Sequence, residues 1–286
     1  MSQLVIPQQS PLYAPLAQLA QQARVAIVVG LPGVGKSLYV QQLAVMAQRA
    51  ERAVYLLQWD VTRSAFETPE HLTRYPEIDG VTHAMIRQAV GLWARGAVSQ
   101  WSADHANDDA LLIGEATFVG ERLMQLARVL DDDAEATLTS RQTQFLLPVP
   151  NRRVRAEIEA KRAQTIANPQ HAHERKDAPP NVLALLWHEI YQVAHQLNIS
   201  DHAPADDPPY DPDIYRRTYE HLLQHRHSVI LPVDELFAPT SSVYQLAGIR
   251  GHLQATPEQA RAIMHRLEAQ HSIEAVQASV ANWYRG

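Results

Sequence analysis

The feature that most constrains this chain is a glycine-rich turn between an apolar run and a helix-compatible stretch. Residues 30–37 read Gly-Leu-Pro-Gly-Val-Gly-Lys-Ser and directly follow the apolar run 25–29. The octapeptide fits the pattern G-x-x-x-x-G-K-[ST], in which backbone N–H groups and a helix N-terminus surround phosphate groups. Strand, loop and helix occur in the order that this pattern requires. The sequence therefore predicts binding of a nucleoside triphosphate.

The residue types of the octapeptide predict how the triphosphate is held. Lys36 can reach the β- and γ-phosphates, where it also serves catalysis, and the Ser37 hydroxyl can ligate Mg²⁺. The expected cofactors are Mg²⁺ and either ATP or GTP, between which the sequence does not choose. The predicted nucleotide-binding residues are Gly30, Gly33, Val34, Gly35, Lys36, Ser37 and Leu38.

Length and charge narrow the range of partners. The 286 residues are enough for one large α/β domain, and the formal net charge of −6 disfavours a nucleic-acid 5′ end as acceptor relative to a small molecule.

Composition also excludes some kinds of site. The absence of cysteine excludes disulfides and thiolate zinc sites, and the 14 histidines show no zinc-binding pattern. No apolar run reaches the roughly 20 residues of a membrane span, and residues 1–15 do not resemble a signal peptide. We expect a cytoplasmic protein with no membrane partner.

Hydrophobic periodicity predicts the fold class. Buried strands alternate with amphipathic helices, which indicates an α/β protein with a mostly parallel sheet in three α/β/α layers. The expected strands are residues 24–29, 53–59, 110–113, 143–149 and 228–233. The expected helices include residues 36–49, 82–101, a stretch from 115 to about 130, 181–197 and 214–225.

The chain divides into three expected segments. Residues 1–23 form an accessory segment with a short amphipathic helix, residues 24–245 form the nucleotide-binding domain, and residues 246–286 form a helical extension. In the extension, Thr256 supplies a predicted N-cap, Pro257 a first helical residue and Gln259 the partner of a capping box.

An acidic and a basic residue follow the second predicted strand. Asp60 stands at the carboxyl end of that strand, where ligands of open α/β sheets bind. Its carboxylate could orient and deprotonate an acceptor hydroxyl, and Arg63 could hold an anionic group of the acceptor. The alternative is structural: Asp60 caps a helix and Arg63 is solvated.

With the 30–37 octapeptide and Asp60-x-x-Arg63, the chain resembles a group of P-loop kinases. The group includes polynucleotide 5′-hydroxyl kinases, gluconate-type sugar kinases, chloramphenicol phosphotransferases and zeta-toxin-like kinases. The resemblance covers roughly residues 24–235 and is highly specific only at the phosphate loop. It implies a P-loop NTPase fold in which Asp60 is the general base and Arg63 contacts the acceptor. It also implies that Glu115 lies close to Mg²⁺ or the acceptor. Arg122 follows one to two turns into the next predicted helix, where it could pair with Glu115; the alternative is that Glu115 is a charge at the helix N-terminus.

The same resemblance implies a mobile lid at about residues 150–178, where basic residues gather. Arg155 and Arg162 are seven residues apart and share one helix face, so both are candidate catalytic cations that neutralise the transferring phosphoryl group. Arg152 and Arg153 are candidate substrate contacts. The alternative is a solvated helix, because Arg155 and Glu159 are spaced for an i,i+4 ion pair.

A second acidic motif favours a different activity. Val229-Ile230-Leu231-Pro232-Val233-Asp234-Glu235 resembles a Walker B motif, in which Asp234 would hold Mg²⁺ and Glu235 would activate water. Pro232 counts against a central strand here and favours an edge strand. The sequence therefore favours a phosphotransferase that moves the γ-phosphoryl group to a hydroxyl or phosphate of a small-molecule or nucleotide acceptor. The alternative is a P-loop ATPase acting as a molecular switch or mechanical protein.

Overall fold

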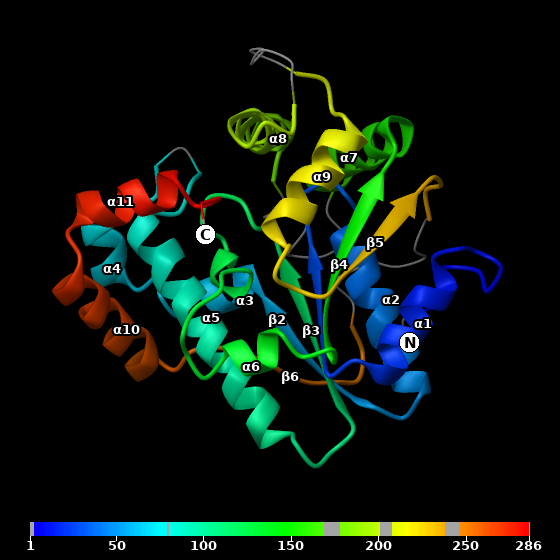
Figure 1. Ribbon diagram of the computed structural model, residues 1–286, viewed down its shortest axis with the longest axis horizontal. Helices are drawn as coiled ribbons and strands as arrows, with labels where there is room; N and C mark the ends of the chain where they lie inside the picture. The colour runs from blue at the N-terminus through cyan, green and yellow to red at the C-terminus, as the bar shows by residue number, and fades with distance from the viewer. Residues whose placement is uncertain (1–2, 79, 169–177, 201–207, 238–245, 286) are drawn as a thin grey trace.

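A sheet of six parallel strands runs through the centre of the computed structural model (Figure 1). The structure describes all residues except 1–2, 79, 169–177, 201–207, 238–245 and 286. The strand order is β5-β4-β1-β3-β2-β6. The strands are β1 (Val25–Val29), β2 (Ala53–Gln58), β3 (Ala110–Ala116), β4 (Thr143–Pro150), β5 (Ser228–Val233) and β6 (Ile249–His252). The predicted α/β class with a parallel sheet is confirmed.

Helices cover both faces of this sheet. Because side chains alternate along a strand, Ala26 and Val28 of β1 pack with helices α1 (Tyr13–Gln22) and α2 (Lys36–Arg49). The other face of β1 packs with helices α5 (Ala84–Asp104) and α9 (Pro212–Leu222). Figure 1 shows α1 and α2 on one side of the sheet and α5 on the other. This arrangement is compatible with three α/β/α layers.

The remaining helices surround this framework. In the view of Figure 1, α7 and α8 lie beyond the carboxyl ends of the central strands, and α10 and α11 pack against α5. None of the described helices is both long enough and apolar enough to cross a membrane. The helices that complete the fold besides α1, α2, α5 and α9 are α3 (Trp59–Arg63), α4 (Pro69–Arg74), α6 (Glu135–Leu138), α7 (Arg152–Ala167), α8 (Pro180–Gln196), α10 (Pro257–Gln270) and α11 (Ile273–Ala281).

The C-terminal segment contributes both helices and a strand. The predicted capping box forms at the start of α10: the Thr256 side chain accepts a hydrogen bond from the Gln259 backbone, and the Gln259 side chain accepts one in return. Residues 246–286, expected to be helical, also supply β6, which pairs with β2. The β6 sequence Ile-Arg-Gly-His lacks an apolar strand pattern, so its pairing with the edge of β2 determines its conformation.

The segment after β3 differs from its prediction. In place of a helix to about residue 130, the chain forms an irregular loop with a single 3₁₀ turn at Met124–Leu126. Phe118, Glu121 and Leu123 adopt positive φ angles in this loop. Two buried arginines donate hydrogen bonds to carbonyl oxygens of this loop. In a helix, backbone N–H groups of the helix itself would occupy those oxygens. Arg95 of α5 donates to the Gln125 and Arg128 carbonyl oxygens, and Arg226 donates to that of Leu126.

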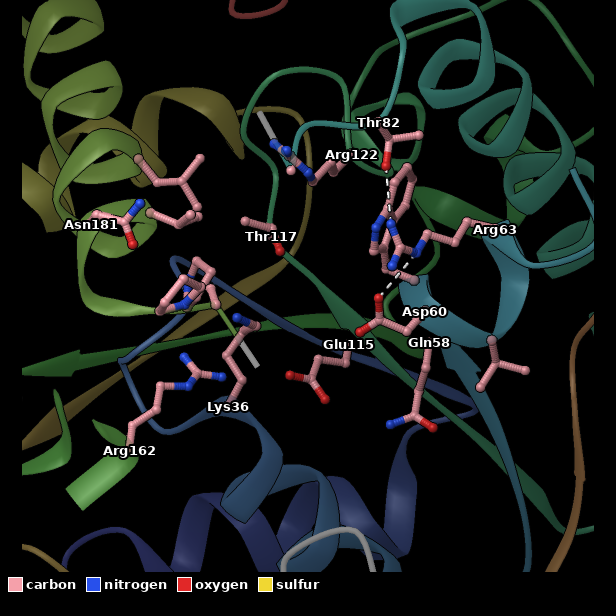
Figure 2. Close-up of a pocket in the computed structure, with 18 residues that line it drawn as sticks. Lys36, Gln58, Asp60, Arg63, Thr82, Glu115, Thr117, Arg122, Arg162 and Asn181 are labelled. Carbon is pink, nitrogen blue, oxygen red and sulfur yellow. Dashed lines mark hydrogen bonds and ion pairs between the residues drawn. The ribbon is translucent and has the colours of Figure 1, made fainter. Parts of the chain in front are cut away.

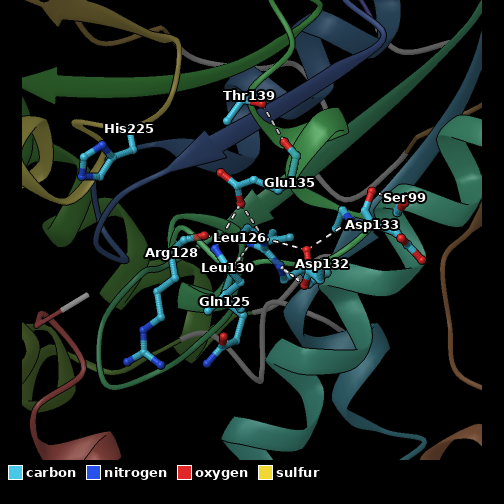
Figure 3. Close-up of polar contacts among 12 residues, drawn as sticks. Ser99, Gln125, Leu126, Arg128, Leu130, Asp132, Asp133, Glu135, Thr139 and His225 are labelled. Atoms are coloured by element: carbon cyan, nitrogen blue, oxygen red, sulfur yellow. Dashed lines mark hydrogen bonds and ion pairs between the residues drawn. The ribbon is translucent and has the colours of Figure 1, made fainter.

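The same two arginines share one carboxylate, that of Glu135, which Figure 3 labels. Glu135 accepts from Arg95 at 2.6 Å and from Arg226 at 2.8 Å, and Asp132 accepts from Arg95 at 2.6 Å. Despite the opposing effect of burial, these arginines lower the pKa of Glu135 to about 2. Asp132, on the exposed turn before α6, thus also belongs to this ion-pair network.

Replacing Glu135 with alanine is expected to destabilise the protein by about 3–5 kcal/mol, because it leaves two buried guanidinium groups without their shared partner. Since the pKa of Glu135 is depressed in the folded state, its contribution is present above the unfolded pKa of about 4.5 and is lost as the pH falls towards about 2. Urea denaturation of wild type and variant at several pH values measures both effects. A difference in unfolding free energy that does not shrink below pH 4 would contradict this account.

Candidate functional site

A cavity of about 400 Å³ opens at the carboxyl ends of β1, β2 and β3 (Figure 2). The order of the strands changes side at β1: β3 and β2 lie on one side of it, and β4 and β5 lie on the other. Crevices outside the carboxyl ends of strands at such a reversal are where open α/β sheets bind ligands. The polar residues lining the cavity are Lys36, Gln58, Asp60, Arg63, Thr82, Glu115, Thr117, Arg122, Arg162 and Asn181.

The glycine loop, residues 30–37, connects β1 to α2 at the edge of this cavity. Gly33 and Gly35 have φ angles of 84° and 86°, which side-chain-bearing residues rarely adopt. At Gly30, a Cβ atom would overlap the Tyr215 hydroxyl oxygen. Helix α2 begins at Lys36, so its N-terminal N–H groups face the loop. This combination of a left-handed loop and a helix N-terminus is suited to holding an anion.

Two side chains of the glycine loop meet polar groups. Lys36 is buried, lines the cavity, and donates from Nζ to the Leu31 carbonyl oxygen at 3.1 Å. The Ser37 hydroxyl donates to Glu115 Oε1 at 3.1 Å. Glu115 lies near the end of β3, paired in register with Val28 of β1. A hydroxyl and a carboxylate in contact provide two oxygen ligands of the kind that Mg²⁺ prefers.

The predicted pairing of Glu115 with Arg122 does not occur. Glu115 is bonded by Ser37, whereas Arg122 donates to the Val119 carbonyl oxygen within the irregular loop after β3. Because this loop replaces the expected helix, Arg122 does not stand on a helix above Glu115. Both residues line the cavity all the same, so the structure places Glu115 beside the glycine loop and Arg122 at a separate position.

Asp60 and Arg63 both reach the cavity from the short helix α3, which begins immediately after β2. Arg63 Nε lies 3.2 Å from Asp60 Oδ1, and Arg63 also contacts Glu67 Oε1 at 3.3 Å and Thr82 Oγ1 at 3.0 Å. The Asp60 side chain is 62% exposed, so a ligand could reach it. The charge of Arg63 is already balanced by two carboxylates.

The four arginines of the predicted lid separate in the structure. Arg162 lines the cavity from α7, as Figure 2 shows beside Lys36. Arg152 pairs with Asp211 at 2.7 Å, and Arg153 pairs with Glu157 at 2.7 Å; both side chains are mostly exposed. Neither Arg152 nor Arg153 lines the cavity, and neither does Arg155. Residues 169–177 of the predicted lid lie outside the described part of the chain.

Arg155 is buried among aromatic rings. Its guanidinium lies 4.2 Å from the centre of the Tyr210 ring and 5.8 Å from that of Trp187, and it pairs with Glu159 at 2.7 Å. The expected Arg155–Glu159 pair therefore forms, but in a buried setting. The cation–π contacts fasten α7 to Trp187 of α8 and to Tyr210, which precedes α9, whereas the ion pair lies within α7.

The second acidic motif lies apart from the glycine loop. Strand β5 is at the edge of the sheet, as Pro232 predicted, and β4 separates it from β1. The Asp234 carboxylate accepts from Asn151 at 3.2 Å, and its carbonyl oxygen accepts from Arg153. Neither Asp234 nor Glu235 lines the cavity; the acidic residue in contact with Ser37 is Glu115.

Sequence reasoning missed several residues of the cavity wall. Thr82 precedes α5, Thr117 follows β3, and Asn181 stands in the first turn of α8. Each stands close to the end of a predicted element, which is the signal that could have singled them out. Comparisons with protein-family models, with curated proteins and with solved structures found no match for this chain.

Proposed function

We propose that this protein is a P-loop kinase that transfers the γ-phosphoryl group of ATP or GTP to a small acceptor. The observation that carries the proposal is that one cavity contains both Lys36 of the glycine loop and Asp60 at the end of β2. Donor and acceptor groups held at these two positions would share a single cavity, as phosphoryl transfer requires.

The donor side of the proposal uses the glycine loop and β3. The loop backbone and Lys36 would bind the triphosphate, while Ser37 and Glu115 would hold Mg²⁺, which would offset the negative charge of the phosphates. The 3.1 Å contact between Ser37 and Glu115 supports this assignment. Arg162 approaches from α7 and adds positive charge where charge develops on the transferring phosphoryl group.

The acceptor side uses the wall formed by α3. Asp60 accepts the proton of the acceptor hydroxyl as that oxygen attacks the γ-phosphorus, and the bond to the β,γ-bridging oxygen breaks. The contact with Arg63 holds the Asp60 carboxylate in place. The phosphorylated acceptor and the nucleoside diphosphate then leave.

Two glutamine substitutions distinguish the kinase from the ATPase alternative. Glu115→Gln is expected to reduce Mg²⁺-dependent turnover by about 10²-fold or more, because it removes a carboxylate from the metal site. Glu235→Gln is expected to leave turnover within about twofold, since Glu235 lies outside the cavity. Consumption of ATP is measured at increasing Mg²⁺ concentrations for wild type and both variants. Active Glu115→Gln beside a Glu235→Gln variant that traps ATP would make this protein an ATPase.

A further inference from the structure

Arg122 supplies a buried positive charge to the wall of the cavity. Its guanidinium donates to the Val119 carbonyl oxygen, and among the described residues no carboxylate forms an ion pair with it. Figure 2 shows Arg122 near Thr117, on the far side of the cavity from Lys36. By contrast, Arg63 has both Asp60 and Glu67 within 3.3 Å.

Arg122 is largely buried, and other charged side chains lie close to it. Nη1 of Arg122 and Oε1 of Glu189 each lie 3.4 Å from where a Cβ of Gly120 would be, and Nη1 of Arg87 also borders this space. Burial lowers the pKa of Arg122. The nearby charge of Glu189 opposes this, that of Arg63 lowers the pKa further, and that of Asp60 raises it. Burial likewise lowers the pKa of Arg87, to about 10, and raises that of Glu189.

Glu189, which lies near Arg122, is held in place by the C-terminal segment. Trp283 donates from its indole nitrogen to Glu189 Oε1 at 2.8 Å, and its carbonyl oxygen accepts from Arg128. Glu189 therefore stays beside the arginines without pairing directly with Arg122. Glu189 and Asp60 act on the charge of Arg122, and Glu189 and Glu121 act on that of Arg87, yet none of these carboxylates forms an ion pair with Arg122. The open direction for a second negative group is the cavity.

We propose that the acceptor carries an oxyanion, a phosphate or a carboxylate, which Arg122 binds while the acceptor hydroxyl faces Asp60. This inference rests on the proposed function and adds the chemical class of the substrate. A planar guanidinium can hold either oxyanion through two parallel hydrogen bonds. Binding there would place negative charge in a site where burial otherwise disfavours the positive charge of Arg122. The role first expected of Arg63, holding the acceptor anion, passes to Arg122.

The test measures oxyanion binding with the donor site already occupied. Protein saturated with Mg²⁺ and a non-hydrolysable ATP analogue is titrated with inorganic phosphate and, separately, with malonate, and binding is followed by the rise in thermal unfolding midpoint. We expect at least one of the two probes to bind wild type. In Arg122→Gln the dissociation constant should rise by about tenfold or more, while the affinity for the analogue is unchanged. The matched control is Arg217→Gln on the exposed side of α9, which should bind like wild type.

Further variants keep this inference separate from the proposed function. Arg122→Lys retains the charge but not the planar fork, so it should bind the probe with intermediate affinity. If the analogue fails to bind wild type, only the proposed function is lost. Lys36→Ala titrated with the probe in the absence of nucleotide should still show the Arg122-dependent binding. Probe affinity that is equal in wild type, Arg122→Gln and Arg122→Lys, or absence of binding to folded wild type by both probes, would overturn the inference.

Discussion

Replacing Lys36 with alanine is expected to lower phosphoryl transfer by at least about 10²-fold and to weaken binding of ATP. Lys36 is buried at the end of the glycine loop and lines the cavity, where its ammonium group would face the β- and γ-phosphates. Nucleotide affinity is measured by titration with a fluorescent ATP analogue, and turnover by release of labelled product.

The control for this variant is Lys161→Ala. Lys161 is exposed on α7, so its loss should change neither affinity nor turnover appreciably. Because Lys36 is buried and bonds the Leu31 carbonyl oxygen, the thermal midpoint of each variant is recorded as well. A folded Lys36→Ala variant with normal ATP affinity and turnover would remove the basis for the predicted triphosphate site.

Replacing Asp60 with asparagine is expected to preserve ATP affinity and to lower turnover by about 10²–10⁴-fold, the usual effect of losing a general base. Asparagine keeps the shape of the side chain but cannot take the acceptor proton. The measurement is turnover at saturating ATP, with nucleotide affinity determined in parallel.

Glu67→Gln is the matched control for Asp60→Asn. Both carboxylates lie close to Arg63, at 3.2 and 3.3 Å, but only Asp60 lines the cavity. If Asp60 serves merely to balance the charge of Arg63, the two variants should lose similar activity. Under the proposed mechanism, Glu67→Gln retains most of its turnover. Comparable rates for the two variants would reduce Asp60 to a structural partner of Arg63.

Much of the fold could be predicted because its signals are local. Apolar runs predicted β1 to β5 to within a few residues, and the capping residues at Thr256 predicted the start of α10. Strand β6 could not be predicted in this way, since Ile249–His252 becomes a strand through pairing with β2. The loop after β3 also escaped prediction, because the arginines that bind its carbonyl groups, Arg95 and Arg226, are distant in sequence.

The candidate site was predictable to a similar extent. Lys36 begins a helix, Asp60 and Arg63 follow β2, and Glu115 stands near the end of β3, so a parallel sheet brings them to one edge. Helical spacing alone grouped Arg155 with Arg162, but only the tertiary structure shows Arg155 beneath Tyr210 and Trp187. The balance of charge around Arg122 likewise depends on Arg87 and Glu189, which come from α5 and α8. The identity of the glycine loop as a phosphate-binding loop remains a prediction.

The most direct test of the central claim is to follow the γ-phosphoryl group itself. ATP labelled in that group is incubated with the protein, Mg²⁺ and a pooled small-molecule extract, and the products are separated and identified by mass spectrometry. The account predicts label on an organic acceptor that appears with wild type, is strongly reduced with Asp60→Asn, and is absent with Lys36→Ala. Label recovered only as inorganic phosphate, at a rate unaffected by Asp60→Asn, would contradict the account.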